Sequence, residues 1–355
     1  MNYLDREILE KANEEAIYNL YLYLAHKAIP DKNDSLQIIL HKLEQASRNS
    51  AYDWDNKDLR RLKLLKNALI SSPALAHSKI GHLTYSKDGL SACVFTHPDG
   101  RVSVAFRGTG DGEWIDNGEG LSGIPEENVY TSFSHFGNVT ESISVKKDYA
   151  TDQQVEALNW FNKVASKEKW NTDTKITVSG HSKGGNKAQF VTIHSDLVNA
   201  CYSFAGQGFS PEALHSFQNR YKEEFEKRRN RIYSFSTDND YVNVLGSRLA
   251  LEDHIYYVES GLGLHNMEAM LDKHCRLRKQ CNQGRISAYA EKLSKDLMKL
   301  RPSVRQYATL GIMNIFQKYV GESIPVNGDS VSTEETLIGI AVAVGSFLRN
   351  LGKLN

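Results

Sequence analysis

The spacing of apolar and polar residues divides the chain into three blocks with different predicted structure. Residues 1 to about 72 are rich in Leu, Ala, Glu and Lys in a helical pattern, which "SSP" at 71–73 breaks. Between residues 89 and about 260, β-branched and aromatic runs alternate with helical stretches, and from about 286 the pattern is helical again. We therefore expect a helical N-terminal extension over 1–75, a core over 76–285 and a helical C-terminal extension over 286–355.

The middle block predicts a layered α/β core. "GLSACVFTHPDGRVSVAFRGTG" at 89–110 predicts two strands joined by a Pro-Asp-Gly turn, and residues 151–170 begin with a T-x-x-Q capping box and continue at helical spacing. Further strands are expected at 175–180, 200–206, 231–237 and 254–260, and a further helix from Pro211 to about Arg229. Strands that alternate with helices favour a mostly parallel sheet flanked by helices.

Residues 110–150 contain glycines and show weak periodicity. Loops of this length inside a compact domain are uncommon and often cover an active site, so we expect a lid here. Its aromatic residues Tyr130, Phe133 and Phe136 are candidates for an acyl-binding wall, with ordinary packing as the alternative.

Composition restricts the class of protein. The 355 residues are 40% apolar and 24% charged, as in soluble globular proteins, and the formal net charge of zero favours no nucleic-acid partner. The acidic N-terminus lacks a secretory signal, and the longest apolar run, 337–348, is too short to span a bilayer; we expect a buried helix there, or a contact with a membrane or lid.

The four cysteines, at 93, 201, 275 and 281, form no C-x-x-C pair. This usage favours a reduced, cytoplasmic protein, with export without a leader left open. Basic residues between Cys275 and Cys281, beside His274, disfavour a metal site there. We expect neither a metal nor a cofactor.

The stretch "KITVSGHSKGGNKAQF", at 175–190, carries the strongest chemical signal. A β-forming run ends at Ser182 between Gly180 and Gly184, and a helical pattern follows. This strand, G-x-S-x-G and helix order is typical of a nucleophile elbow, in which a sharp turn exposes the serine hydroxyl. The alternative, a glycine-rich turn that cradles phosphate, lacks both common phosphate-loop motifs.

A serine nucleophile needs an imidazole and an orienting carboxylate, which in α/β hydrolases follow in the order Ser, Asp, His. Asp238 and Asp240 both follow the strand at 231–237, and two residues apart they face the same side, so either can fill the role. A structural role in turning the chain is the alternative for both.

His265 lies in a glycine-rich loop after the strand at 254–260, where the sheet should present its site. It is therefore the expected base. His254 begins a strand, and the side chain of His181 should point away from the neighbouring Ser182 hydroxyl, so both are weaker candidates.

The developing negative charge on an attacked carbonyl oxygen also needs donors. One is the backbone N–H of Lys183, the residue after the nucleophile. Thr109, which follows the strand "VSVAF" in "RGTG", stands where the second donor is required.

At these residues the chain resembles the class 3 (fungal-type) lipases and a bacterial lipase-like α/β-hydrolase family. The shared segments span roughly 100–270 and are "VAFRGT", "EWIDN", "TVSGHSKGGNKA", "CYSFAGQGFS", "TDNDYVN" and "GLGLHN". The resemblance implies an α/β-hydrolase fold in which Ser182 is the nucleophile, His265 the base and acid, and Asp240 the orienting carboxylate of an N-D-x-V motif. It also implies Thr109 and Lys183 as the oxyanion donors. The candidate substrate contacts are His181, Trp114, Tyr130, Phe133 and Phe136.

The chain departs from the class 3 lipases at two points. Lys183 replaces the leucine usual in their elbow, and Trp114 and Asp116 stand closer to Thr109 than their counterparts do.

We expect a serine hydrolase that cleaves carboxylic esters, with acyl lipids as the implied substrates and a peripheral membrane contact as an additional expectation. A thioesterase, peptidase or acyltransferase with the same triad is the alternative among enzymes. A silent hydrolase-like binding module is the alternative outside them.

Overall fold

The computed structural model describes residues 2–49, 53–86, 89–108, 114–133, 141–261 and 264–320, and all of these except 114–115 and 314–320 with their side chains. The α-helices are α1 (Arg6–Leu22), α2 (Leu36–Ala46), α3 (Asn56–Ser71), α4 (Pro73–Ala76), α5 (Trp114–Ser122), α6 (Asp152–Lys167), α7 (Lys183–His194), α8 (Pro211–Tyr221), α9 (Glu223–Arg229), α10 (Arg285–Met298) and α11 (Pro302–Val320). The strands are β1 (Lys79–Thr84), β2 (Ala92–Thr96), β3 (Val102–Phe106), β4 (Glu126–Phe133), β5 (Glu141–Asp148), β6 (Ile176–His181), β7 (Val198–Phe204), β8 (Ile232–Thr237), β9 (Ile255–Val258) and β10 (Gln280–Cys281), and two 3₁₀ turns cover Glu252–His254 and Met267–Met270.

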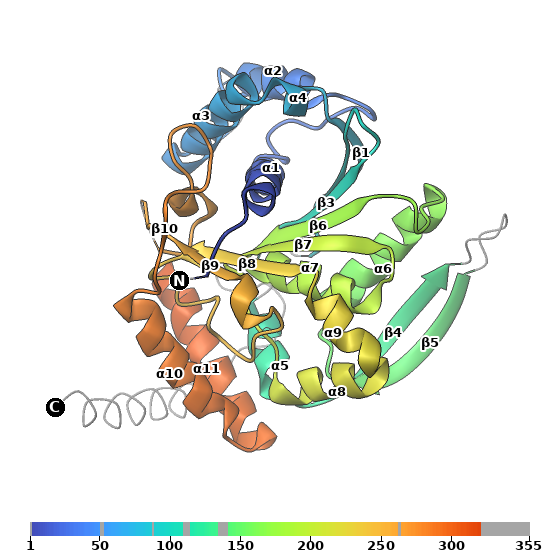
Figure 1. The fold of residues 1–355 in the computed structure, drawn as a ribbon, viewed down its shortest axis with the longest axis vertical. Helices are drawn as coiled ribbons and strands as arrows, with labels where there is room; N and C mark the ends of the chain where they lie inside the picture. Colours follow the sequence, from blue (N-terminus) through green and yellow to red (C-terminus); the bar gives the residue numbers. More distant parts are fainter. Residues whose placement is uncertain are drawn as a thin grey trace.

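An eight-stranded sheet forms the centre of the described structure, in the order β1-β2-β3-β6-β7-β8-β9-β10 (Figure 1). Its middle strands β3, β6, β7, β8 and β9 pair in parallel, and the pairs at both ends are antiparallel. The predicted α/β-hydrolase fold, a mostly parallel sheet flanked by helices, is confirmed. All the strands expected between residues 89 and 260 are present.

Helices α1–α4 cover one face of the sheet (Figure 1). Side chains alternate along β2, so that Cys93 and Phe95 pack against these helices while Ala92 and Val94 pack on the opposite face of the sheet. The N-terminal helices are therefore one of the two helical layers around the sheet.

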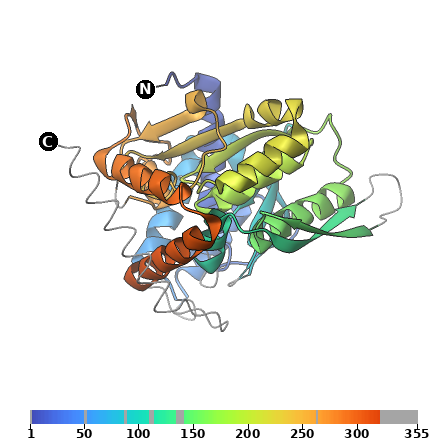
Figure 2. The same ribbon diagram turned by 90° about the horizontal axis from the view of Figure 1, so that it is seen from below.

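Helices α6–α9 cover the other face, where Phe161 of α6 and Phe190 of α7 are fully buried. The predicted capping box at the start of α6 is present, between Thr151 and Gln154. At the end of the sheet, α11 runs alongside α5, and the Thr309 hydroxyl donates to the Gly118 carbonyl at 3.1 Å (Figure 2). In the described ranges, no helix is long and apolar enough to cross a membrane.

Two secondary-structure predictions need correction. The helix expected from Pro211 to Arg229 is two helices, because Lys222 adopts a positive φ of 48° that interrupts it and lets Phe225 turn into the core. Residues 110–150, expected as a long loop, contain α5 and the two-stranded hairpin of β4 and β5. The apolar run at 337–348 lies outside the described residues.

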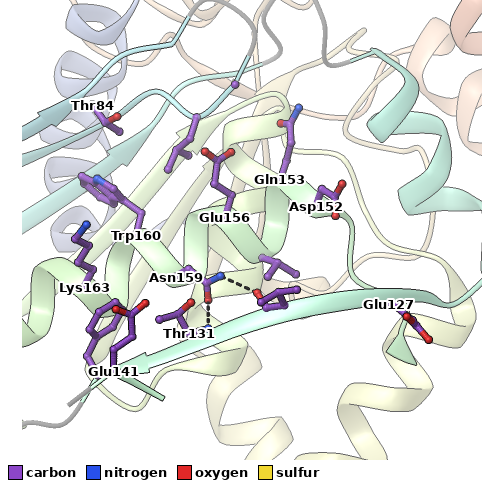
Figure 3. Close-up of a pocket in the computed structure, with 15 residues that line it drawn as sticks. Thr84, Glu127, Thr131, Glu141, Asp152, Gln153, Glu156, Asn159, Trp160 and Lys163 are labelled. Carbon is purple, nitrogen blue, oxygen red and sulfur yellow. Dashed lines mark hydrogen bonds between the residues drawn. The ribbon is translucent and has the colours of Figure 1, made fainter. Parts of the chain in front are cut away.

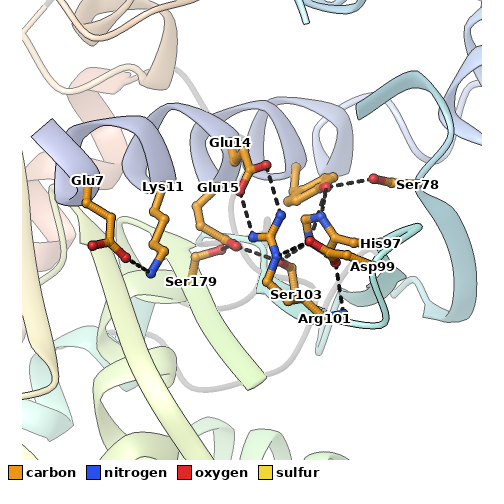
Figure 4. A network of polar contacts seen from close by, with 11 residues as sticks. Glu7, Lys11, Glu14, Glu15, Ser78, His97, Asp99, Arg101, Ser103 and Ser179 are labelled. Carbon is orange, nitrogen blue, oxygen red and sulfur yellow. Dashed lines mark hydrogen bonds and ion pairs between the residues drawn. The ribbon is translucent and has the colours of Figure 1, made fainter. Parts of the chain in front are cut away.

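A buried carboxyl group ties α1 to the middle of the sheet (Figure 4). Glu15 is 3% exposed, and its two carboxyl oxygens lie 2.5 Å from Ser103 Oγ on β3 and 2.6 Å from Ser179 Oγ on β6. Burial raises the pKa of Glu15 from its ordinary 4.5 to about 8, against the opposing effect of the two serine hydrogen bonds. Burial therefore favours the protonated form of Glu15 in the folded protein.

This shift predicts a pH-dependent stability. Between about pH 5 and pH 8 the unfolded chain loses the Glu15 proton while the native protein keeps it, so the free energy of unfolding should fall as pH rises, by about 1.4 kcal/mol per pH unit from this group. Glu15→Gln should remove that part of the slope in urea unfolding. Glu10→Gln, on the exposed side of α1, is the control and should keep it; equal slopes in the wild type and Glu15→Gln would contradict the assignment.

Candidate active site

The turn between β6 and α7 has the geometry of a nucleophile elbow. Ser182 adopts φ 59° and ψ −126°, a strained conformation for a residue with a side chain. A Cβ atom on Gly180 would lie 2.0 Å from the Gly184 carbonyl oxygen, and one on Gly184 would lie 2.1 Å from the Phe106 carbonyl oxygen. The predicted close approach of strand and helix at these two glycines is thus present.

Three loops bring a hydroxyl, an imidazole and a carboxylate together at the carboxyl ends of β6, β8 and β9. Ser182 Oγ lies 2.8 Å from His265 Nε2, and His265 Nδ1 lies 2.8 Å from Asp240 Oδ2. Because an ionised carboxylate only accepts, Nδ1 carries the proton of a neutral His265 and leaves Nε2 free to accept from the Ser182 hydroxyl. The side chain of Asp240 is 1% exposed and that of His265 is 21% exposed, so of these two side chains only the imidazole is open to solvent.

The Asp240 carboxylate is fixed by its own loop. Its Oδ1 atom accepts from the backbone N–H groups of Val242 at 2.7 Å and Asn243 at 3.0 Å, which leaves Oδ2 for His265. Asp238 instead accepts from the Ser260 hydroxyl and, at 3.0 Å, from Asn239 Nδ2. Of the two aspartates that sequence left open, Asp240 is the one that contacts His265.

The competing histidines have other partners. His254 Nδ1 lies 3.2 Å from the Ile232 carbonyl oxygen, and its ring stacks on Tyr233. His181 is 5% exposed, with Nδ1 2.6 Å from the Tyr23 hydroxyl and Nε2 2.8 Å from the His265 carbonyl oxygen. Both ring nitrogens of His181 are hydrogen-bonded within the protein, and a substrate contact for this residue stays a prediction.

The structure describes two of the three aromatic residues of the predicted lid. Tyr130, on β4, is 6% exposed and packs into the hydrophobic core. Its hydroxyl donates to the Asp148 carboxylate at 2.7 Å. Phe133 lines a groove of about 680 Å³ between β4 and α6, with Trp160 and Lys163 (Figure 3). The lining of this groove includes none of Ser182, Asp240 and His265. The role of Tyr130 and Phe133 in an acyl-binding wall stays a prediction. Phe136 lies outside the described residues, as does the side chain of Trp114.

The two expected oxyanion donors differ in how far the structure describes them. Lys183 is the first residue of α7, so its N–H belongs to the positive end of a helix dipole. Thr109 lies outside the described residues. Gly108, just before it, packs against the elbow, because a Cβ atom there would lie 3.1 Å from Ser182 Cβ.

The Lys183 side chain forms a buried ion pair that sequence reasoning missed. It is fully buried and pairs with Asp116 of α5, which also accepts from Thr151 Oγ1 at 2.9 Å and the Gln153 N–H at 3.2 Å. The departure from leucine at position 183 signalled an unusual environment, but nothing local identifies the partner. The pair fastens α5 to the first turn of α7.

Two further residues that sequence did not indicate hold the His265 loop. Tyr23, at the end of α1, reaches His181 over 158 residues of chain, and the Thr237 hydroxyl donates to the Leu264 carbonyl. Neither residue belongs to a motif, so only the tertiary contact reveals it.

A double-mutant cycle tests the buried pair. Lys183→Met and Asp116→Asn should each destabilise the protein by about 3–5 kcal/mol, because each leaves one buried charge uncompensated. The double variant should lose less than the sum of the two, by about 1–3 kcal/mol, in urea unfolding. The same cycle on the exposed pair Arg6–Glu10 should show little coupling. Additive losses at 183 and 116 would mean that the pair is not coupled.

Comparison with known proteins gives matches of two kinds. In structure, the chain is similar to the Rhizomucor miehei lipase in its propeptide complex, with 14% identity, 69% of this chain and 65% of that chain covered, and a TM-score of 0.36. It is also similar to M37 lipase, with 14% identity, 68% and 70% covered, and a TM-score of 0.32. The chain thus spans slightly under two thirds of the Rhizomucor miehei chain.

In sequence, no curated protein matches the chain. The family model described as Mbeg1-like matches residues 139–311. Both matched structures are lipases, the class of protein that the sequence resemblance names. Over the stretch that carries Ser182, Asp240 and His265, this chain matches the Mbeg1-like family.

Proposed function

We propose that this protein is a serine hydrolase that cleaves carboxylic esters through an acyl-enzyme intermediate. The observation that carries the proposal is the continuous pair of contacts from Ser182 Oγ to His265 Nε2 and from His265 Nδ1 to Asp240 Oδ2, each 2.8 Å. A serine hydroxyl becomes an effective nucleophile when an oriented imidazole accepts its proton. The strained elbow, which presents that hydroxyl at a helix N-terminus, supports the same reading.

In the acylation step, Ser182 Oγ attacks the ester carbonyl carbon as its proton moves to His265 Nε2. The carbonyl oxygen becomes an oxyanion, stabilised by the Lys183 N–H and, by our expectation, by Thr109. Asp240 stabilises the imidazolium through Nδ1–H without taking the proton. Collapse of the tetrahedral intermediate breaks the ester C–O bond, and His265 gives the proton to the departing alcohol.

Deacylation runs through the same groups in reverse. A water molecule takes the place of the alcohol, and His265 Nε2 removes its proton as the oxygen attacks the acyl carbon. The second tetrahedral intermediate releases the carboxylic acid and returns the proton to Ser182 Oγ. Acyl lipids are the ester class that the sequence resemblance implies.

Covalent labelling tests the nucleophile. A fluorophosphonate should phosphonylate Ser182 with loss of fluoride, since only a serine beside an oriented base reacts readily with such reagents. Mass spectrometry should find the adduct on Ser182 in the wild type and none in Ser182→Ala. Ser216→Ala, on α8, is the control and should label like the wild type. A wild type that stays unlabelled would favour the silent binding module.

Matched substitutions at the two aspartates test the orienting carboxylate. Asp240→Asn should lower kcat/KM for p-nitrophenyl esters by about 10³- to 10⁴-fold, because a neutral amide neither fixes the required tautomer of His265 nor stabilises the imidazolium. Asp238→Asn should stay close to the wild type, since that carboxylate contacts Ser260 instead. A larger loss at 238 than at 240 would reverse the assignment.

A further inference from the structure

We propose that Tyr23 and His181 are positioning residues that hold the backbone of His265 in place for catalysis, so that the N-terminal helices help to aim the base. This inference rests on the proposed hydrolase function and deepens it. It assigns a role to a segment outside the stretch of the chain that matches the Mbeg1-like family.

The hydrogen-bond directions in this relay are fixed by the groups at its ends. The His265 carbonyl oxygen can only accept, so His181 Nε2, 2.8 Å away, carries the proton and donates. In a neutral imidazole the other nitrogen then accepts, and the Tyr23 hydroxyl, 2.6 Å from Nδ1, is its donor. Burial, with a smaller contribution from the nearby His265, lowers the pKa of His181 well below its ordinary value, which keeps the ring neutral and the directions unchanged.

Tyr23 is itself held from two sides. The guanidinium of Arg61, on α3, lies 4.3 Å from the centre of the Tyr23 ring. Arg61 Nε also donates to Oε1 of Glu268 at 2.7 Å, and both side chains are nearly buried. Glu268 stands three residues after His265 in the chain. A Cβ atom on Gly108 would lie 2.8 Å from the Tyr23 hydroxyl, so the segment that follows β3 packs against that oxygen too. The N-terminal helices thus support the segment around His265 at two points, at the His265 carbonyl through Tyr23 and His181 and at Glu268 through Arg61.

The contact falls on the segment of backbone that most directly sets the imidazole position. The Thr237 hydroxyl fixes the Leu264 carbonyl and His181 fixes the His265 carbonyl, so two consecutive peptide groups are held. The Gly261 N–H donates to the Ala269 carbonyl at 2.8 Å and closes the loop behind them. Loss of the His181 contact frees one of these two groups and lets the imidazole move relative to Ser182.

Three variants and a matched control test the relay. His181→Phe removes both hydrogen bonds and should lower kcat for p-nitrophenyl acetate about 100-fold with little change in KM, because a displacement of about 1 Å at a catalytic group costs that much. Tyr23→Phe removes only the hydroxyl and should lower kcat about tenfold. His181→Gln, whose amide can still donate to the His265 carbonyl, should recover part of the loss. The control is Tyr21→Phe on the same helix, whose buried hydroxyl has no partner among the described residues, and it should keep wild-type kcat.

A second readout does not depend on ester hydrolysis. The low-field proton resonance of the His265 Nδ1–H, hydrogen-bonded to Asp240, should be sharp in the wild type and Tyr21→Phe, and broadened or lost in His181→Phe, with thermal unfolding confirming that each variant is folded. Unchanged kcat and an unchanged resonance in both His181→Phe and Tyr23→Phe would overturn the relay while leaving the hydrolase proposal intact. If the wild type neither hydrolyses esters nor reacts with fluorophosphonate, the hydrolase proposal fails, and the resonance alone then decides whether His181 positions His265.

Discussion

The strained backbone of Ser182 is the constraint on which the candidate site depends. A positive φ is unfavourable for a residue with a side chain. It persists only where the surrounding contacts hold the backbone in that conformation. Here the Ser182 N–H donates to the Phe204 carbonyl of β7 at 2.8 Å, and its own carbonyl accepts from Gly185 at 2.9 Å. Gly180 and Gly184 then allow α7 to approach within a distance that any Cβ would prevent. The sheet and the helix together hold the hydroxyl at the position that His265 reaches.

Buried polar groups fasten the layers of the protein around this turn. On the side of the N-terminal helices, Glu15 joins α1 to β3 and β6; on the other, Lys183 joins α7 to α5 through Asp116. Such groups are costly to bury and add little stability compared with well-packed apolar residues. Their effect here is geometric, because each contact is satisfied in only one relative placement of the elements. The Glu15 contact involves β6 and the Lys183 contact involves α7, the two elements that flank Ser182.

The N-terminal helices therefore have two consequences for one site. They bury one face of the sheet, where Tyr18 of α1 stacks on Phe95 of β2. They also reach the segment around His265, directly through the Arg61–Glu268 pair and indirectly through Tyr23, which contacts His181. The sequence resemblance, which spans roughly 100–270, contains the reacting groups but not these supports. Displacing α1 would affect both the packing of the sheet and the geometry at His265, so folding and activity should respond together to changes in this helix.

The sequence by itself determined the features that depend on local spacing. Periodicity of two or of 3.6 residues identified the strands and helices of the core, and G-x-S-x-G identified the turn at Ser182, because these patterns act over a few residues. Tertiary structure alone decided what depends on contacts through space: that Asp240 rather than Asp238 meets His265, that His181 is taken up by Tyr23 and a backbone carbonyl, and that Lys183 pairs with Asp116. The hairpin of β4 and β5 escaped sequence analysis for a related reason. The alternation in β5 is limited to Ile143 and Val145, and both side chains are exposed, so β5 has no buried apolar face. Spacing along a chain fixes which face a side chain takes, whereas its partner is set by the packing of elements as far apart as Tyr23 and His181, which are separated by 158 residues.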